Sequence, residues 1–261
     1  MQDGGVRPSG TYVTPESSKF AVMVKEMTMR HEFSPLIYYY APHYANTFSD
    51  SQEYLRISHF DSDTISSLPP ASYFGPKDMA EIEKIKFPPA IRDHIISRIA
   101  LKNAVCEFVK ERQGRILTPK DFYCTHNQYG QPIIERCKTG VMLAEPLFVS
   151  LAHKDYRAVV AVADRPVGVD LEKIEEKSAE FLELAYTTQE ITLLRKLNSP
   201  EAAIRFWIAK EAVAKKSGFG LQGKPQSFEI TKIEGKRLTI ASTSVRVVKV
   251  EADYLLGWTL T

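Results

Sequence analysis

The longest regular pattern of hydrophobic residues lies in residues 90–112. Apolar side chains recur there at helical spacing, namely at Ile91, Ile95, Ile99, Val105 and Val109, with Ile96 and Leu101 beside them. Such spacing places the apolar residues on one face of an α-helix. The pattern therefore predicts a long amphipathic helix that follows Pro88-Pro89 and ends before Gly114.

Two further stretches have a helical pattern. Residues 177–197 are expected to be helical, and a second helix is expected to begin after Ser199-Pro200. Serine is a favoured N-cap residue, and proline is favoured at the first helical position. This helix contains "AIRFWIAKEAVAKKS" and is expected to end at Gly218, since glycine readily adopts the backbone conformation that follows a helix.

Strand-like patterns occupy most of the remaining chain. Residues 36–40 ("LIYYY") consist of strong β-formers, and residues 147–163 are expected to form a strand, a turn and a strand. Residues 167–172 predict another strand, and residues 226–261 predict several more around a turn at Gly235. Residues 41–75 are expected to be an irregular loop, and "QYGQP" at 128–132 a turn. Helices against mostly antiparallel strands indicate an α+β fold.

Composition narrows the class of protein without naming a function. The 261-residue chain has a formal net charge of +2, with 44% hydrophobic and 25% charged residues. This balance is ordinary for a globular protein and does not indicate a nucleic-acid or membrane-surface partner. The three cysteines, Cys106, Cys124 and Cys137, form no CxxC pair, so reduced thiols in a cytoplasmic protein are expected.

The two ends of the chain carry separate expectations. No apolar run approaches the roughly 20 residues that span a bilayer, and the first residues lack the apolar core of a secretory signal. Residues 1–35 are therefore expected to be a flexible extension. The chain stops at an apolar "LLGWTLT", which suits either a natural end or a domain excised from a longer polypeptide.

The stretch "PVGVDLEKIEEK" (166–177) contains the first candidate chemistry. Because side chains alternate along a strand, Gly168, Asp170 and Glu172 share one face. Two carboxylates beside a residue without a side chain suggest a Mg²⁺ site that a bulky anion approaches through the glycine gap. The alternative interpretation is the solvated face of a half-buried strand.

The helix expected at 200–217 adds a second group. Trp207, Glu211 and Lys215 follow i, i+4, i+8 spacing and share a face, so Glu211 is a candidate metal ligand or general base and Lys215 a candidate phosphate contact. A solvated Glu–Lys pair is the alternative. His153, in the turn between two expected strands, would suit a phosphate, or would simply be an exposed turn histidine.

These residues together resemble the signature of the 4′-phosphopantetheinyl transferases. "VGVDLE" (167–172) is followed by Trp207-x-x-Lys210-Glu211-x-x-x-Lys215, and "YGQP" (129–132) resembles the family's Gly-x-Pro element. "LFVSLAHKDYRAVVAVA" resembles its Ser-His segment. The resemblance covers roughly residues 129–225. Length and "IISRIALKNAV" (95–105) point to the larger, two-lobed Sfp-like class.

The resemblance implies an architecture. Members of that class look like two similar α+β lobes around a pseudo-twofold axis, each a mostly antiparallel sheet packed on a long helix, with the active site in the cleft between them. The expected division is a 1–35 extension, an N-terminal lobe at 36–145 and a C-terminal lobe at 146–261 that carries the metal and catalytic motifs. A monomer is expected, because one chain supplies both lobes.

It also implies an activity. Such enzymes transfer the 4′-phosphopantetheine group of coenzyme A to a serine of an acyl or peptidyl carrier protein, as in fatty acid or polyketide synthesis, and release adenosine 3′,5′-bisphosphate. Asp170, Glu172 and Glu211 would bind Mg²⁺, with Mn²⁺ as an alternative, and Glu211 and Lys215 would be catalytic. The residues expected to bind coenzyme A are His153, Lys210, Gly130, Gln131, Pro132, Arg98 and Lys102.

Three positions depart from the family pattern, and other functions stay open. Gln131 stands where a lysine is frequent, Ala152 where a serine precedes the histidine, and Ile208 where a small polar residue or cysteine follows the tryptophan. The apolar segment 181–197 is a candidate docking surface for the carrier, which could be a domain of a polyketide synthase. The alternatives are a Mg²⁺-dependent hydrolase of a nucleotide pyrophosphate and a non-catalytic carrier-binding domain.

Overall fold

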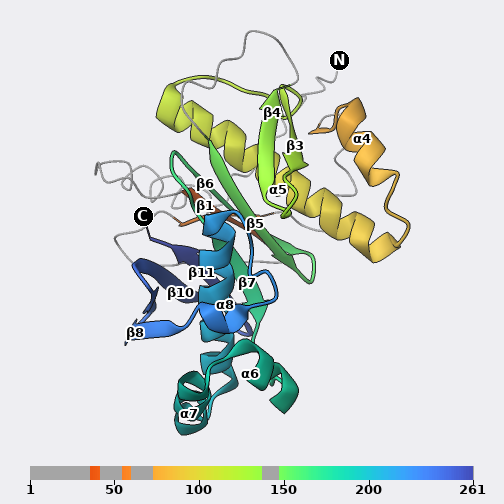
Figure 1. Cartoon of the computed structure of the whole chain (residues 1–261). Helices are drawn as coiled ribbons and strands as arrows, with labels where there is room; N and C mark the ends of the chain where they lie inside the picture. Colours follow the sequence, from red (N-terminus) through yellow and green to blue (C-terminus); the bar gives the residue numbers. More distant parts are fainter. Residues whose placement is uncertain (1–35, 42–54, 60–72, 137–146, 261) are drawn as a thin grey trace, which may run out of the picture. The chain divides into compact units, whose positions relative to one another are not determined.

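The structure is a computed structural model that describes residues 36–41, 55–59, 73–136 and 147–260, all within one compact unit, Ser34–Thr261. It contains antiparallel sheets packed on helices, which confirms the α+β prediction (Figure 1). Among these residues, no helix has both the length and the hydropathy to cross a membrane.

The first sheet has the strand order β2-β1-β6-β5, from strands β1 (Leu36–Ala41), β2 (Leu55–His59), β5 (Phe148–Lys154) and β6 (Arg157–Ala163). β1 and β2 are parallel, and the other neighbours are antiparallel. A two-residue turn at Asp155-Tyr156 joins β5 to β6, and both turn residues have positive φ (47° and 61°), as tight hairpin turns require.

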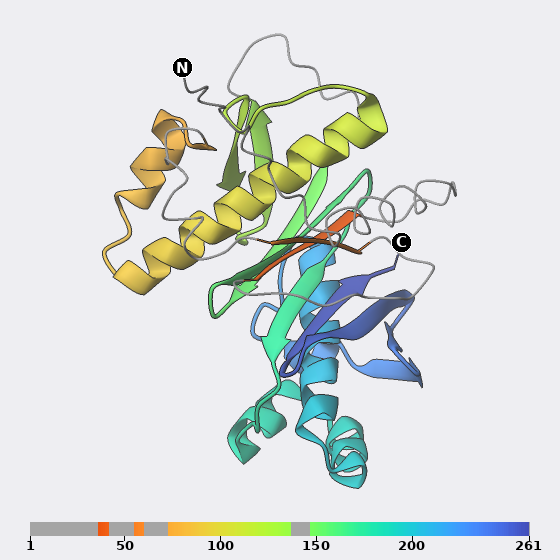
Figure 2. The same ribbon diagram turned by 180° about the vertical axis from the view of Figure 1, so that it is seen from behind.

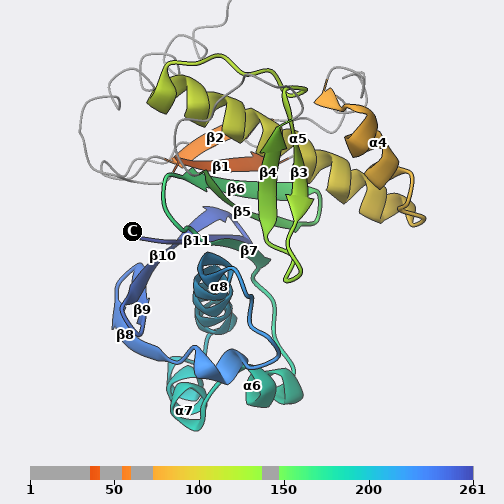
Figure 3. The ribbon, with the colours of Figure 1, turned by 45° about the horizontal axis from the view of Figure 1, so that its top comes forward.

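Helix α5 (Pro88–Gln113) covers one face of this sheet. Its buried side chains, among them Leu101 and Val105, form one core with Val160 and Val162 of β6. The short helix α4 (Pro76–Ile82) and the hairpin of β3 (Phe122–His126) and β4 (Pro132–Arg136) lie beside α5 (Figures 1 and 3).

The second sheet has the order β7-β11-β10-β9-β8 and is antiparallel throughout. Its strands are β7 (Val169–Lys173), β8 (Ile230–Glu234), β9 (Arg237–Ile240), β10 (Thr243–Glu251) and β11 (Tyr254–Thr259). Helix α8 (Pro200–Ser217) packs on one face of it (Figure 2). The helix can lie close to β11 because Gly257 has no side chain: a Cβ there would come within 2.3 Å of Ile208 Cγ2.

The faces of the two sheets that are not covered by α5 and α8 pack against each other in a separate apolar core. Val159 and Ala161 of β6 pack there with Val169 and Leu171 of β7 and Trp258 of β11. The alternation predicted for residues 167–172 is therefore confirmed, since Val167, Val169 and Leu171 all belong to this core.

Polar contacts join the two hairpin turns that end these sheets. Arg157 donates to both carboxylate oxygens of Glu251 (2.9 and 2.8 Å), and the Tyr254 hydroxyl donates to Asp155 (2.5 Å). Arg157 also lies over the Tyr254 ring. The turn of the β5–β6 hairpin is thus held against the turn of the β10–β11 hairpin.

Several predicted elements are confirmed. The helix predicted at 90–112 spans Pro88–Gln113, and the next long helix ends as predicted at Gly218, whose φ of 79° is left-handed. As predicted, Ser199 is the N-cap residue and Pro200 stands in the first turn, although the Ser199 hydroxyl makes no capping hydrogen bond. The predicted Gly235 turn joins β8 to β9.

Other predictions were wrong. Residues 55–59 lie in the expected loop but form β2, which pairs with β1 through the backbone. The single helical segment expected at 177–197 is two helices, α6 (Ala179–Ala185) and α7 (Thr188–Leu197). Thr187 caps the second, because its hydroxyl accepts from the Glu190 N–H while Glu190 accepts from the Thr187 N–H. The predicted "YGQP" turn is the tip of the unpredicted β3–β4 hairpin.

Candidate functional site

The polar face of strand β7 lies against helix α8. Gly168 makes this contact possible, because a Cβ at that position would lie 1.8 Å from the Ala212 carbonyl oxygen and 2.7 Å from the Lys216 nitrogen. Helix backbone therefore fills the space that the sequence suggested as an approach for a ligand, and that interpretation of Gly168 is wrong. The glycine instead brings α8 close enough for its side chains to reach the strand's carboxylates.

Asp170 is the carboxylate nearest to α8. It is buried, and its Oδ1 accepts a hydrogen bond from Lys215 Nζ at 2.7 Å. Its other oxygen, Oδ2, is buried without a hydrogen-bond partner. An unpaired buried carboxylate oxygen is costly, so this atom is suited to accept from a donor or to bind a cation.

Glu172, two residues along the same face, has a similar unpartnered atom. Its Oε2 is buried without a hydrogen bond, although Lys154 Nζ lies 3.1 Å away in an orientation that is not a hydrogen bond. Burial, and then the charge of Asp170, raise the pKa of Glu172 above its usual value. The two carboxylates thus repel each other in a poorly solvated place.

Glu211 on α8 completes the acidic group. Burial raises its pKa to about 7, and the charges of Asp170 and Glu172 add to the rise, against the opposing effect of Lys215. A carboxyl with a pKa near neutrality can both accept and return a proton at physiological pH. The structure therefore brings together four of the predicted residues: Asp170, Glu172, Glu211 and Lys215.

These carboxylates suit a hard divalent cation by their chemistry. Carboxylate oxygens are the ligands that Mg²⁺ prefers, and two buried ones have no hydrogen bond. A cation would offset the repulsion that raises the pKa of Glu172 and Glu211. Within the described ranges, no three His, Cys, Asp or Glu side chains are already drawn together as a metal-binding group. The residues present fit Mg²⁺ in charge and donor type.

The loop between β3 and β4 meets the end of α8. Asn127 Nδ2 donates to the Gly218 carbonyl oxygen at 3.5 Å, and a Cβ at Gly218 would lie 2.7 Å from Gln131 Oε1. Tyr129 and Phe219 form an edge-to-face pair with centroids 5.1 Å apart. This contact brings Gly130, Gln131 and Pro132, the start of β4, to the helix end that carries Lys215.

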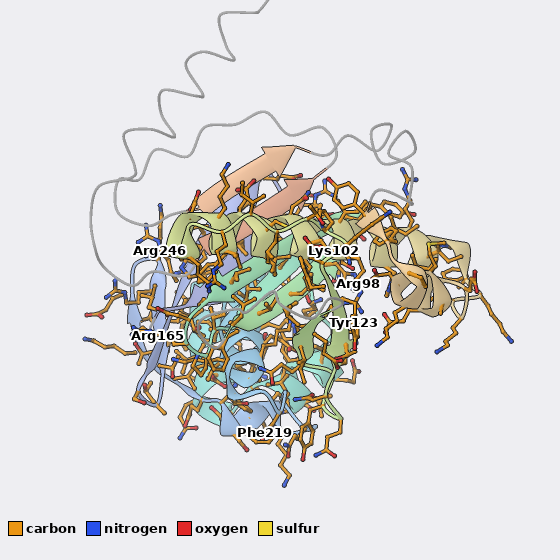
Figure 4. The ribbon with its side chains drawn as sticks, turned by 90° about the horizontal axis from the view of Figure 1, so that it is seen from above. Arg98, Lys102, Tyr123, Arg165, Phe219 and Arg246 are labelled. Carbon is orange, nitrogen blue, oxygen red and sulfur yellow. The ribbon has the colours of Figure 1, made fainter. Side chains whose placement is uncertain are left out.

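His153 lies on another part of the surface. It is exposed near the end of β5, and its charge acts on His94 of α5, whose pKa is lowered to about 4 mainly by burial and then by Arg98. Arg98 is itself buried and donates to Glu81 at 3.2 Å (Figure 4). His153 and Arg98 thus both act on His94 of α5, and Glu81 opposes their effect.

Two of the predicted ligand residues are lysines with other partners. Lys102 is fully buried and donates to Asp78 Oδ2 (3.0 Å) and to the carbonyl oxygens of Pro119 and Phe122 (Figure 4). Lys210 is likewise fully buried. It donates to Glu190 Oε2 at 2.7 Å and to the Pro225 carbonyl oxygen at 3.1 Å. The structure does not bring these two ammonium groups to the carboxylates of β7.

Sequence reasoning missed Lys154, although its neighbour His153 was a candidate. Its importance comes from the contact between the two sheets. The Val169 N–H donates to Ser150 Oγ at 3.0 Å, which places the start of β7 beside β5 and the Lys154 ammonium beside Glu172. No sequence pattern marks a contact between two sheets that do not pair.

The cysteines follow the expectation where the structure describes them. Cys106 and Cys124 are free thiols, and burial raises the pKa of both. Raised thiol pKa values oppose thiolate chemistry, so neither is a good nucleophile. Cys137 lies outside the described residues.

Comparisons with known proteins bear on the same region. No curated protein matches the chain. The family model of the 4′-phosphopantetheinyl transferase superfamily matches residues 166–258. The match begins at Pro166, just before the carboxylate strand, and includes α8 and all strands of the second sheet; residues 129–165, where the sequence also resembles the family, lie outside it. Residues 166–258, which hold Asp170, Glu172, Glu211 and Lys215, are therefore a domain of the 4′-phosphopantetheinyl transferase superfamily.

Proposed function

We propose that this protein transfers the 4′-phosphopantetheine group of coenzyme A to a serine of an acyl or peptidyl carrier protein. The observation that carries the proposal is the meeting of Asp170 and Glu172 on β7 with Glu211 and Lys215 on α8, within the matched domain. A cluster of carboxylates with unpartnered oxygens suits a metal-bound pyrophosphate better than it suits a purely structural ion pair.

Asp170, Glu172 and Glu211 would hold a Mg²⁺ or Mn²⁺ ion. When bound, the ion would neutralise the pyrophosphate and polarise its phosphorus–oxygen bonds. In the transfer, the serine oxygen forms a bond to the β-phosphorus and the bond to adenosine 3′,5′-bisphosphate breaks. The proton of the serine hydroxyl passes to the base, and the bridging oxygen leaves on adenosine 3′,5′-bisphosphate, so the step balances without an oxidant.

Glu211 is the proposed base in this reaction. A serine hydroxyl is a weak nucleophile, so a nearby group must take its proton, and Glu211 is the carboxylate that α8 adds beside Asp170 and Glu172. Lys215, at 2.7 Å from Asp170, would orient that carboxylate and face the negative charge that develops on the leaving oxygen.

Coenzyme A would extend from this site toward the first sheet. His153 and Arg98 are proposed for its 3′-phosphate, and Gly130, Gln131 and Pro132 for its adenosine end, since this loop abuts the end of α8. Lys102 and Lys210 are proposed to act indirectly, because protein oxygens bind both ammonium groups. They would fix the helices that carry the contacting residues.

The two-lobed class is also proposed for this chain. Its support is a pair of long helices, each packed on one mostly antiparallel sheet, and an apolar core between the sheets. The division into a 1–35 extension, a 36–145 lobe and a 146–261 lobe stays a proposal. β5 and β6 follow residue 145 but belong to the first sheet, where β6 pairs with β1 and β5 pairs with β6. A monomer in the cytoplasm, fatty acid or polyketide synthesis as the pathway, and segment 181–197 as the carrier's docking surface are proposals of the same kind.

Intact-protein mass spectrometry tests the transferase directly. The protein is incubated with coenzyme A, Mg²⁺ and apo carrier proteins, and each carrier is expected to gain one phosphopantetheine group. Glu211→Gln should slow this gain by about 10²–10⁴-fold, as loss of a general base does. Glu234→Gln, at the exposed end of β8, is the matched control and should leave the rate unchanged.

Two outcomes would replace the proposal. Breakdown of coenzyme A without any carrier gain indicates the pyrophosphate hydrolase. Carrier binding with neither transfer nor breakdown indicates a domain that binds carriers without chemistry. Full activity in Glu211→Gln would remove Glu211 from the mechanism.

A further inference from the structure

Lys154 is a basic side chain beside the carboxylates that the proposed reaction does not use. It ends strand β5, and its Nζ lies 3.1 Å from Glu172 Oε2, with side-chain exposures of 33% and 17%. Lys215 already occupies Asp170 Oδ1. Each of the two carboxylates on β7 therefore has its own lysine, one from α8 and one from β5.

The two lysines hold their carboxylates in different ways. Lys215 donates to Asp170 at 2.7 Å, and that carboxylate is only 6% exposed. The ion pair of Lys154 with Glu172 is longer, at 3.1 Å, and its carboxylate is 17% exposed. A partly exposed lysine on a flexible stem can leave such a position at little cost, unlike the fully buried Lys102 and Lys210.

A divalent cation is suited to the space beside Glu172 Oε2 and Asp170 Oδ2, because both oxygens are buried without a hydrogen bond. A cation there would be attracted by both carboxylates, but it would be repelled by an ammonium at 3.1 Å from one of them.

We propose that Lys154 is a resident countercation of the metal site, which neutralises Glu172 in the metal-free protein and must move away when the divalent ion binds. It thereby sets the metal affinity, acting as a positioning residue that contacts no reacting atom. The inference rests on the proposed function only in taking Asp170 and Glu172 as metal ligands.

The direction of the effect follows from the charges. Removing the ammonium removes its repulsion of the incoming ion and leaves Glu172 without a competing cation. Metal affinity should therefore rise in Lys154→Met, which keeps the length and apolar stem of the side chain. For one charge a few ångströms from a divalent ion in a partly solvated site, the expected gain is about tenfold.

Mn²⁺ binding measures this without any turnover. Free Mn²⁺ is followed by electron paramagnetic resonance in titrations of the full chain, first alone and then with coenzyme A. The matched control is Lys173→Met: Lys173 follows Glu172 in the same strand, and its Nζ lies 3.6 Å from Asp253 instead. The control changes the net charge by the same amount and should alter the affinity by less than about twofold, because its charge is farther from the ion and more exposed to screening.

The outcomes separate this inference from the proposed function. Tighter Mn²⁺ binding in Lys154→Met but not in Lys173→Met supports it, even if no carrier is ever modified. Unchanged or weaker Mn²⁺ binding in Lys154→Met overturns it, even if transfer is intact. A variant that binds Mn²⁺ as before but loses affinity for coenzyme A also overturns it and makes Lys154 a phosphate ligand. Absence of Mn²⁺ binding in all three proteins, with coenzyme A present, overturns it as well.

Discussion

Each of the two long helices of this protein has one buried lysine, and the two lysines have the same kinds of partners. Lys102 of α5 binds Asp78, and Lys210 of α8 binds Glu190. Each acid also accepts a backbone N–H three residues before it, from Gly75 and Thr187 respectively. Each long helix is thus fixed to a preceding helix by an ion pair between a buried lysine and an acid that also accepts a backbone N–H.

The parallel continues beyond the acids. Both lysines donate to the carbonyl oxygen of a proline that follows the long helix, Pro119 at 2.8 Å and Pro225 at 3.1 Å. The lysines are fully buried, so their charges are tolerated only because oxygens surround them. The sequences around the two lysines give no hint of this, since only one of them lies in a family signature.

The surfaces that the two helices present are different. α8 faces a strand with two carboxylates and adds Glu211 and Lys215. α5 instead carries His94, whose pKa is lowered to about 4, and Arg98, which pairs with Glu81. Similar packing therefore supports a group of carboxylates beside α8 and a histidine–arginine pair on α5. The comparison teaches that the buried lysines secure the helices, while the chemistry depends on the residues around them.

The largest expected effect comes from breaking the two lysine contacts. Lys102→Met and Lys210→Met should each lower the free energy of unfolding by about 3–5 kcal/mol, because each leaves a buried carboxylate without its cation. Urea denaturation measures the loss. If the two contacts are equivalent, the losses agree within about 1 kcal/mol.

Double variants test whether the loss comes from the stranded acid. Asp78→Asn with Lys102→Met, and Glu190→Gln with Lys210→Met, should each be less damaging than the sum of their single changes. A single variant within about 0.5 kcal/mol of the parent protein would show that its lysine does not secure its helix.

A smaller effect is expected at the contact that only the α8 side has. Gly168→Ala should lower the free energy of unfolding by about 1–3 kcal/mol, because its Cβ would lie 1.8 Å from the Ala212 carbonyl oxygen and push α8 away from β7. Metal affinity should fall with it. Gly75→Ala is the control, since the nearest atom to its Cβ would be Asp78 Oδ2 at 3.8 Å. Equal stability of the two variants would refute the close contact.

The smallest expected effect concerns the pH dependence of stability, which should differ in sign between His94 of α5 and Glu211 of α8. Folding lowers the pKa of His94 from about 6.5 to about 4. The contribution of His94 to the free energy of unfolding is therefore fully present above pH 6.5 and is lost as the pH falls toward 4. In the metal-free protein, folding raises the pKa of Glu211 from about 4.5 to about 7. The contribution of Glu211 to the free energy of unfolding is therefore fully present below pH 4.5 and is lost as the pH rises through 7.

Denaturation between pH 4 and pH 8 with a chelator present separates the two. His94→Gln should remove about 1 kcal/mol of the acid-side loss and Glu211→Gln a similar part of the neutral-side loss, after allowance for solvent screening. Identical pH profiles for the parent protein and both variants would show that neither group titrates differently on folding.

Periodic segments were predictable from the sequence. Residues 88–113 and 200–217 are long and regularly patterned, and glycines that follow each of them mark the ends. Strand alternation correctly placed Asp170 and Glu172 together, because side chains of a strand can only alternate. The short elements were not predictable. β2, α4 and the β3–β4 hairpin have few residues, and their stability comes from neighbours that are distant in the sequence.

The roles of individual residues divide in the same way. Spacing alone gave Glu211 and Lys215 a common helix face, and the structure places both beside Asp170. Lys210 has the same kind of signature but is turned inward to Glu190, and a charged residue on a helix shows no sign of its burial. Lys154 became part of the site only because β5 lies next to β7.

The sequence by itself determined the residue types of the site, the periodicity that groups them on one strand and one helix, and the two motifs of the family signature at 167–172 and 206–218. The tertiary structure decided which charges are exposed and which are paired, because burial and ion pairing depend on segments that are far apart in the chain. It also gave Gly168 its role. The glycine is needed for the close packing of β7 on α8. That packing brings Glu211 near Asp170 and Glu172, so that the carboxylates repel one another.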